Sequence, residues 1–185
     1  MRIRLAADLQ TDSIVDGLGI RTVIWAQGCS HNCPSCHNPG THDFNGGDLV
    51  ELDDVIEELE NLSGQDGVTF SGGDPMFQPK QCSILAEKIH ELDMNVWAYT
   101  GFTYEELIEK GNKDILDFLS NIDVLIDGKF ELDKKSLDCE FRGSTNQRLI
   151  DVPKSLENHE VVLFDLNKKM NRKEKKETLY IWSFF

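Results

Sequence analysis

The chain has 185 residues, of which 39% are hydrophobic, so it is long and apolar enough for one folded domain with an ordinary core. Its formal net charge of −14 is unevenly distributed, since residues 168–185 carry +4 and residues 1–167 carry −18. The acidic body argues against nucleic-acid binding, and no apolar run approaches the roughly 18 residues of a membrane span.

The two ends of the chain give further expectations. The first residues contain too short an apolar stretch for a secretory leader, and the number of cysteines, five, is odd. We therefore expect a cytoplasmic protein without structural disulfides. Residues 168–185 are basic and then aromatic, which predicts a C-terminal tail distinct from a domain of residues 1–167.

Short runs with β propensity alternate with helical patterns along the chain. Apolar positions at helical spacing predict three helices, and the spacing of Thr103 and Glu106 is that of a capping box that opens a fourth. This alternation predicts an α/β fold with a parallel sheet. The expected strands are 22–26, 68–70, 95–99, 124–126 and 161–164, and the three expected helices lie around 52–62, 82–92 and 115–119.

Polar motifs follow four of the expected strands directly. They are Gly28-Cys29, the segment 71–75, Thr100-Gly101 and Asp127-Gly128. Because chemistry collects at the carboxyl ends of the strands in barrel-type α/β folds, we expect these motifs to meet at one mouth. A complete eightfold barrel takes about 250 residues, so the chain predicts a partial (βα) barrel of about five to six units.

Cys29, Cys33 and Cys36 form a C-x3-C-x2-C run. A closed [4Fe–4S] cluster normally has four cysteine ligands, so three would leave one iron open to a substrate. Two other interpretations are a zinc site, which prefers four ligands, and c-type haem attachment at residues 33–37, which requires export. The cysteines alone leave these alternatives open.

The cysteine spacing resembles the signature of the radical S-adenosylmethionine (radical SAM) superfamily, in which the open iron binds SAM. Gly72, Gly73 and Asp74 resemble the segment that receives the SAM ammonium group in these proteins. Paired glycines let a backbone approach a ligand closely. The resemblance implies a radical SAM partial barrel with one [4Fe–4S] cluster and SAM as its cofactors.

Other segments narrow the resemblance. Residues 16–21 resemble the lead-in of glycyl-radical-enzyme activases, and residues 99–106, 123–130 and 141–148 resemble the activating proteins of anaerobic (class III) ribonucleotide reductase. That resemblance makes Asp127, Lys129 and Asn146 candidate SAM contacts. Lys129 would face the SAM carboxylate as a point charge, and Asn146 would offer a hydrogen-bond donor and an acceptor.

The same resemblance implies a reaction and its partners. An electron donor such as flavodoxin would reduce the cluster, SAM would be cleaved, and the resulting radical would take hydrogen from a glycine of the reductase catalytic subunit. One alternative is an activase of another glycyl-radical enzyme, such as pyruvate formate-lyase. Others are a radical SAM enzyme for a small molecule, as in deazapurine synthesis, and a non-enzymatic iron–sulfur or zinc-binding module.

Overall fold

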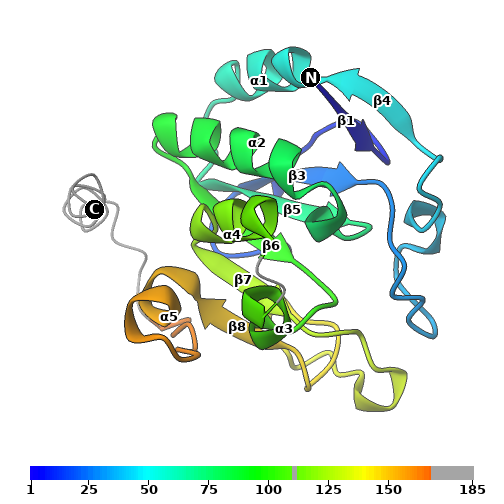
Figure 1. Ribbon diagram of the computed structural model, residues 1–185, viewed down its shortest axis with the longest axis vertical. Helices are drawn as coiled ribbons and strands as arrows, with labels where there is room; N and C mark the ends of the chain where they lie inside the picture. The colour runs from blue at the N-terminus through cyan, green and yellow to red at the C-terminus, as the bar shows by residue number, and fades with distance from the viewer. Residues whose placement is uncertain (110–111, 168–185) are drawn as a thin grey trace.

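The computed structural model describes residues 1–109 and 112–167, and these residues are built around one mixed sheet (Figure 1). The expected C-terminal tail lies outside the described residues, so the division of the chain at residue 167 stays a prediction. The strands of the sheet are β1 (Arg2–Leu5), β2 (Gln10–Ser13), β3 (Arg21–Ala26), β4 (Asp48–Glu51), β5 (Gly67–Gly72), β6 (Asn95–Tyr99), β7 (Val124–Asp127) and β8 (Arg148–Asp151).

The sheet has a parallel centre and antiparallel margins. Its order is β4-β1-β3-β5-β6-β7-β8, with β2 also paired to β3. Strands β3, β5, β6 and β7 run parallel, so their carboxyl ends lie at one edge, on the right in Figure 1. The two end strands, β4 and β8, do not pair with each other within the described residues, which leaves the sheet open. The α/β fold and the partial barrel are confirmed.

Four of the five expected strands are confirmed as the parallel centre of the sheet. The fifth, 161–164, is wrong, since only Leu163 forms an isolated bridge, and its partner is Ile150 of β8. Strand β8 instead occupies the place beside β7 and runs antiparallel to it. The antiparallel strands β1, β2 and β4 were not expected, since each has only four residues. Strand β2 contains no hydrophobic residue, and β1 alternates arginine with Ile3 and Leu5 over too short a stretch to stand out.

Helices cover one face of the sheet, at the front in Figure 1. The predicted capping box is present, since the Thr103 N–H donates to Glu106 Oε2 at 2.7 Å and the Glu106 N–H donates to Thr103 Oγ1 at 3.2 Å. Of the described helices, none is long and apolar enough to cross a membrane. The helices are α1 (Leu52–Glu60), α2 (Pro79–Glu91), α3 (Tyr104–Glu109), α4 (Lys113–Ser120) and α5 (Val152–Asn158), with three-residue 3₁₀ turns η1 (Pro39–Thr41), η2 (Pro75–Phe77) and η3 (Leu132–Lys134).

Alternating side chains of the central strands fill two separate cores. On β7, Leu125 belongs to the large core under the helices, whereas Val124 and Ile126 point to the opposite face. On β6, Ala98 and Trp97 divide in the same way. This period of two is what a strand buried on both faces requires. The second core fills the interior of the partial barrel and brings neighbouring loops onto it.

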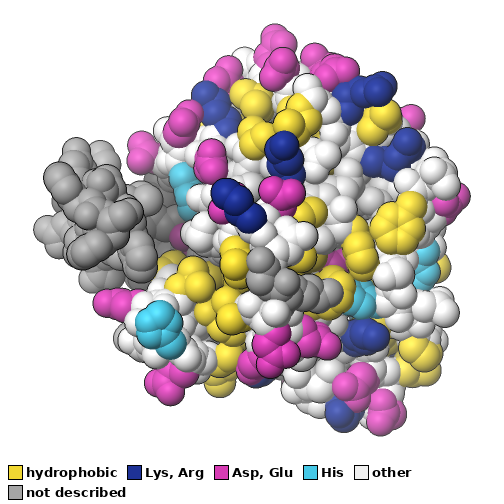
Figure 2. All heavy atoms as spheres, in the orientation of Figure 1, with side chains coloured by type: hydrophobic (Ala, Val, Ile, Leu, Met, Phe, Trp, Pro, Cys, Tyr) yellow, Lys and Arg dark blue, Asp and Glu magenta, His cyan; other side chains and the backbone are white. Residues whose placement is uncertain are grey.

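The outer surface reflects the acidic composition of the chain. Figure 2 shows Asp and Glu side chains spread over the helical face, with Lys and Arg interspersed among them. Within the described part of the chain, Lys88 of α2 pairs with Glu60 at 2.7 Å and with Glu91 at 3.4 Å. Such exposed pairs are screened by water and contribute little, so the stability of the fold comes mainly from its two cores.

Candidate functional site

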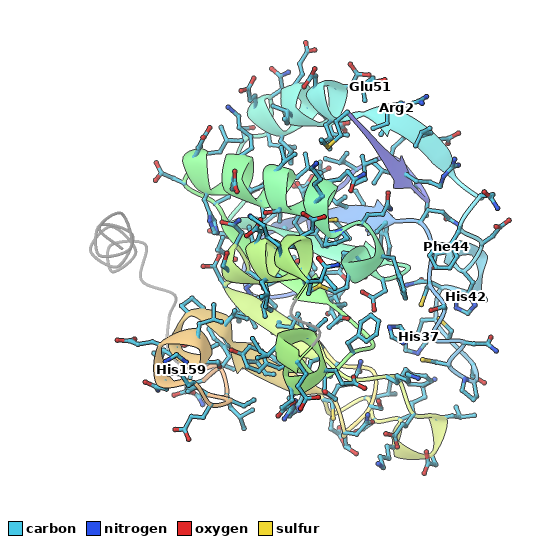
Figure 3. The ribbon with its side chains drawn as sticks, viewed as in Figure 1. Arg2, His37, His42, Phe44, Glu51 and His159 are labelled. Carbon is cyan, nitrogen blue, oxygen red and sulfur yellow. The ribbon has the colours of Figure 1, made fainter. Side chains whose placement is uncertain are left out.

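The three clustered cysteines lie on the loop that leaves β3 at the carboxyl edge of the sheet. The Gly28 N–H donates to the Thr41 carbonyl at 2.8 Å, and the Cys29 N–H donates to the His42 carbonyl at 3.2 Å. Figure 3 shows His37, His42 and Phe44 along this same edge, on the right of the view. The loop is therefore fastened along its base to the segment that follows it.

The loop turns back on itself between the cysteines. Asn32 and Ser35 adopt left-handed backbone conformations, with φ of 53° and 57°. The Cys36 N–H donates to the Cys33 carbonyl at 3.1 Å, which closes the turn between these two ligand candidates. Turns of this kind direct backbone N–H groups to one side, and such concavities occur at many iron–sulfur sites.

The donor set fits an iron–sulfur cluster. Cys29, Cys33 and Cys36 are free and partly buried, and the Asn38 N–H donates to Cys36 Sγ at 3.4 Å, a contact that suits a thiolate. Within residues 1–109 and 112–167, no three His, Cys, Asp or Glu side chains gather as they would around a single ion. A cubane cluster places one thiolate on each iron, so its ligands need no such common point.

The surroundings of the thiols act on their protonation in opposite directions. Burial raises the pKa of Cys29, and the nearby Asp74 carboxylate raises it further. Burial also raises the pKa of Cys33, whereas a backbone N–H of Phe130 and the charge of Lys129 lower it. Metal ligation needs the thiolate, so Lys129 and Phe130 favour the form that binds.

Gly72 and Gly73 press the end of β5 against the cysteine loop. Gly72 has φ of +96°, and a β-carbon there would lie 2.6 Å from the carbonyl oxygen of Ala26. A β-carbon at Gly73 would lie 2.5 Å from the carbonyl oxygen of Gly28. Any other residue at either position would force the two loops apart.

Asp74 sits beneath the cysteine loop and is 1% exposed. Its Oδ1 accepts the Met76 N–H at 2.9 Å, and its Oδ2 accepts Thr100 Oγ1 and the Gly101 N–H, both at 2.9 Å. The fourth partner is His31, whose Nε2 lies 2.6 Å from Oδ2. The contact with the SAM ammonium group stays a prediction, and in this structure protein donors surround the carboxylate.

Two further motifs meet the cysteine loop from the other side. The ring of Phe130 lies 4.7 Å from that of His37, and a β-carbon at Gly143 would lie 3.1 Å from His37 Cε1. We call the segments around Phe130 and Gly143 the facing lip. An open cavity of about 660 Å³ lies between Phe130 of this lip and Cys33 of the cysteine loop. Its lining consists of His31, Cys33, Pro34, Lys129, Phe130, Glu131, Leu132 and Asp133.

Of the expected SAM contacts on this lip, Lys129 and Asn146 lie side by side. Lys129 is exposed at the cavity, and its carbonyl accepts Asn146 Nδ2 at 2.8 Å. Asn146 Oδ1 is buried and accepts no hydrogen bond from the described residues. A buried acceptor without a partner is costly, so this oxygen fits a ligand that brings a donor.

Asp127 is 1% exposed and points away from the cavity toward α3. It accepts the Tyr104 N–H at 2.8 Å and Arg148 Nε at 3.0 Å, and Arg148 Nη2 pairs with it closely as well. Arg148 also binds Glu105 at 2.7 Å. The contact of Asp127 with SAM stays a prediction, and its observed hydrogen bonds join β7 to β8 and to the start of α3.

The lead-in segment 16–21 lies at the opposite edge of the sheet, where β3 begins. The Arg21 guanidinium is fully buried and donates to Thr69 Oγ1 at 2.6 Å, to the Val68 carbonyl at 2.7 Å and to Asn95 Oδ1 at 2.8 Å. Burial lowers its pKa to about 10. Arg21 of this motif therefore braces the sheet at the edge opposite the mouth.

One residue of the candidate site, His31, was missed in the sequence analysis. His31 lies between Cys29 and Cys33, and it was assigned no role in the site from the sequence. Its pairing with Asp74 joins positions 43 residues apart, so no local spacing could have indicated it. The capping preference of Asp74 for η2 was the available signal that this carboxylate faces backbone donors.

Comparison with known proteins gives consistent matches. Residues 15–150 match the family model described as a 4Fe-4S single cluster domain. The anaerobic ribonucleoside-triphosphate reductase-activating protein of Salmonella typhi is 35% identical over 72% of this chain and 90% of its own length. Proteins of the same name from Pasteurella multocida and Enterobacteria phage T4 are 37% and 35% identical, over 72% and 73% of this chain and 89% and 86% of theirs.

Among solved structures, the crystal structure of QueE from Escherichia coli aligns with a TM-score of 0.46 and 13% identity, over 56% of this chain and 54% of its own. The assignment to a family rests on the sequence relatives. More than a third of the aligned residues are identical in each of them, and the alignment covers most of each relative's length. The chain therefore belongs to the anaerobic ribonucleoside-triphosphate reductase-activating proteins, a radical SAM family with a single 4Fe-4S cluster domain.

Proposed function

We propose that this protein activates an anaerobic ribonucleotide reductase by cleaving SAM and forming a glycyl radical on its catalytic subunit. The observation that carries the proposal is that the cysteine loop meets four other segments at one edge of the sheet. The cysteine loop contacts the ends of β5 and β6 through Gly73 and Gly101, and it contacts the two activase-like segments through Phe130 and Gly143.

Each part of this edge has a proposed task. Cys29, Cys33 and Cys36 hold three irons of a [4Fe–4S] cluster, and Lys129 and Asn146 bind SAM from the facing lip. The backbone at Gly72 and Gly73 gives SAM a close approach to the cluster. When bound, the reduced cluster supplies the electron that splits SAM into methionine and a 5′-deoxyadenosyl radical. The protein residues bind, orient and shield these groups.

The cavity is open on one side, which suits a macromolecular substrate. A glycine can lose hydrogen only when it lies in van der Waals contact with the radical, so a loop of the reductase subunit must enter the cavity. Leu132 lines the cavity and is 50% exposed, and it would contact such a loop. A flavodoxin-type donor would reduce the cluster from outside the cavity.

Further expectations concern location, nucleic acid and the tail. All five cysteines are free, which supports a reducing cytoplasmic setting. The −18 charge of residues 1–167 supports the absence of a nucleic-acid partner. We also propose that residues 1–167 form the radical SAM domain and that residues 168–185 are an appended tail.

The test is electron paramagnetic resonance on the anaerobically reconstituted, reduced protein, followed by mixing with reductase subunit. We expect a cluster signal that changes when SAM is added, 5′-deoxyadenosine as a product, and a glycyl radical on the reductase. Alanine at Cys29, Cys33 or Cys36 should abolish all three results, whereas Cys82→Ala and Cys139→Ala should preserve them. A glycyl radical formed only on pyruvate formate-lyase would overturn the proposed partner.

A further inference from the structure

The ring of His31, between Cys29 and Cys33, is turned under the cysteine loop, where it contacts Asp74. Its side chain is 7% exposed, and its Nε2 lies 2.6 Å from the Asp74 carboxylate. A carboxylate can only accept, so Nε2 carries the hydrogen and donates it. With that nitrogen engaged, the ring is held at a fixed distance from the sheet.

Asp74 gathers donors from three separate segments. Met76 lies in η2, Thr100 and Gly101 follow β6, and His31 belongs to the cysteine loop. Oδ2 faces three of these donors and Oδ1 faces one, so the carboxylate is held from several sides. Asp74 therefore joins the cysteine loop to the ends of both β5 and β6.

Aromatic rings enclose the same contact. The imidazole of His31 lies 4.5 Å from the ring of Phe102 in an edge-on arrangement and 5.8 Å from that of Phe77. These rings pack against the largely buried pair, and a charged hydrogen bond is stronger where the surroundings are apolar. The Gly101 backbone lies against the other side of the imidazole, since a β-carbon there would overlap it.

We propose that His31 is a positioning residue for the cluster, held by Asp74, and that this pair sets the distance between the cysteine loop and the sheet. The inference rests on the proposed function, because it assumes a cluster on Cys29, Cys33 and Cys36. It deepens that function by giving Asp74 the task of orienting the ligand loop. Outer contacts that orient metal ligands in this way are common in metal sites.

The first test compares His31→Ala, His31→Gln and Asp74→Asn in the full chain after anaerobic reconstitution. We expect the alanine and asparagine variants to lose iron to a chelator about 10- to 100-fold faster than the unmodified protein. Both should also shift the midpoint potential of the cluster. Glutamine can still donate an N–H toward Asp74, so His31→Gln should recover most of the retention and the potential.

The second test is a double-mutant cycle. If the two side chains act only through each other, His31→Ala combined with Asp74→Asn should be no worse than either single variant. The matched control is His90, whose Nε2 lies 3.1 Å from Asp123 Oδ2 at the opposite edge of the sheet. His90→Ala should leave iron retention and the potential unchanged, and thermal unfolding of every variant reports general loss of stability.

The outcomes separate the possible roles. Additive losses of iron retention in the double variant would overturn the inference. So would a His31→Ala protein with unchanged retention and potential beside an Asp74→Asn protein that only binds SAM more weakly, since Asp74 would then contact SAM itself. Failure of the unmodified, cluster-loaded protein to form a glycyl radical would contradict the proposed function and leave the cluster measurements interpretable.

Discussion

The imidazole of His31 lies directly against the α-carbon of Gly101, so that a β-carbon at position 101 would overlap the ring. The ring cannot simply swing aside, because Asp74 and Phe102 hold its other sides. Because of this contact, a small change in the backbone after β6 would also displace the cysteine loop that follows β3.

Gly101→Ala should therefore displace His31 and weaken retention of the iron–sulfur cluster about 10-fold or more. The measurement is the iron and acid-labile sulfide content per chain after reconstitution and gel filtration. Gly40→Ala is the control, since nothing lies within 4 Å of a β-carbon at that position of η1. Equal cluster contents in the two variants would contradict the prediction.

Lys129→Ala should weaken SAM binding while the cluster stays intact. Removal of one charged contact typically costs about 1.5–3 kcal/mol, which corresponds to a roughly 10- to 100-fold higher Kd. The Kd is measured by titrating SAM into the reduced protein and following the cluster signal. Lys135→Ala, an exposed change in the same connection, should leave the Kd unaltered. An unaltered Kd for Lys129→Ala would remove this side chain from the SAM site.

Glu105 should give stability a specific dependence on pH. Its hydrogen bond with Arg148 lowers the pKa of the Glu105 carboxyl in the folded state. The associated stabilisation is complete above the unfolded pKa of about 4.3 and is lost as pH falls through the folded value. Glu105→Gln should therefore destabilise the protein at neutral pH and make its acid unfolding less steep.

Chemical denaturation at a series of pH values checks this expectation. Glu58→Gln, which changes an exposed carboxylate of α1, provides the comparison. If the Glu105 and Glu58 variants follow the same stability curve, the ion pair with Arg148 contributes no measurable pH dependence.

Arg21→Met should destabilise the fold without touching the cluster edge. It removes a buried guanidinium that serves the Thr69 hydroxyl and the Val68 carbonyl, and each unpaired buried acceptor costs about 1–3 kcal/mol. We expect a loss on the order of 3 kcal/mol in the free energy of unfolding. Arg2→Met should cost far less, since Arg2 lies 3.8 Å from Glu51 in an exposed pair that Figure 3 shows at the surface.

The parallel centre of the sheet could be predicted because each of its strands is a short apolar run bounded by polar motifs, as in 124–126 before Asp127. The antiparallel strands at the margins of the sheet could not be predicted in this way. Strand β2, Gln10–Ser13, has no hydrophobic residue and forms only because β3 offers it hydrogen bonds. Conversely, the apolar run 161–164 predicts a strand, but it does not form one, because β8 occupies the place beside β7.

The site divides in a similar way. The cysteines and their neighbouring motifs were accessible from spacing and from their positions after strands. The contacts of Asp74 and Asp127 were not, because both carboxylates are buried against partners from distant segments, such as His31 and Arg148. Sequence patterns indicate which residues reach an edge of the sheet, whereas the direction of each side chain depends on the packing of the whole fold.

The segment 161–164 protects an edge of the sheet. The Phe164 N–H donates to the Leu149 carbonyl at 2.9 Å, and the Asp151 N–H donates to the Val162 carbonyl at 2.9 Å, so backbone groups of β8 are already paired. A bare strand edge is a template for other chains, and an apolar run with high β propensity is prone to self-association. A truncation before residue 161 would therefore expose β8 and invite aggregation, whereas a truncation after residue 167 would keep this edge closed.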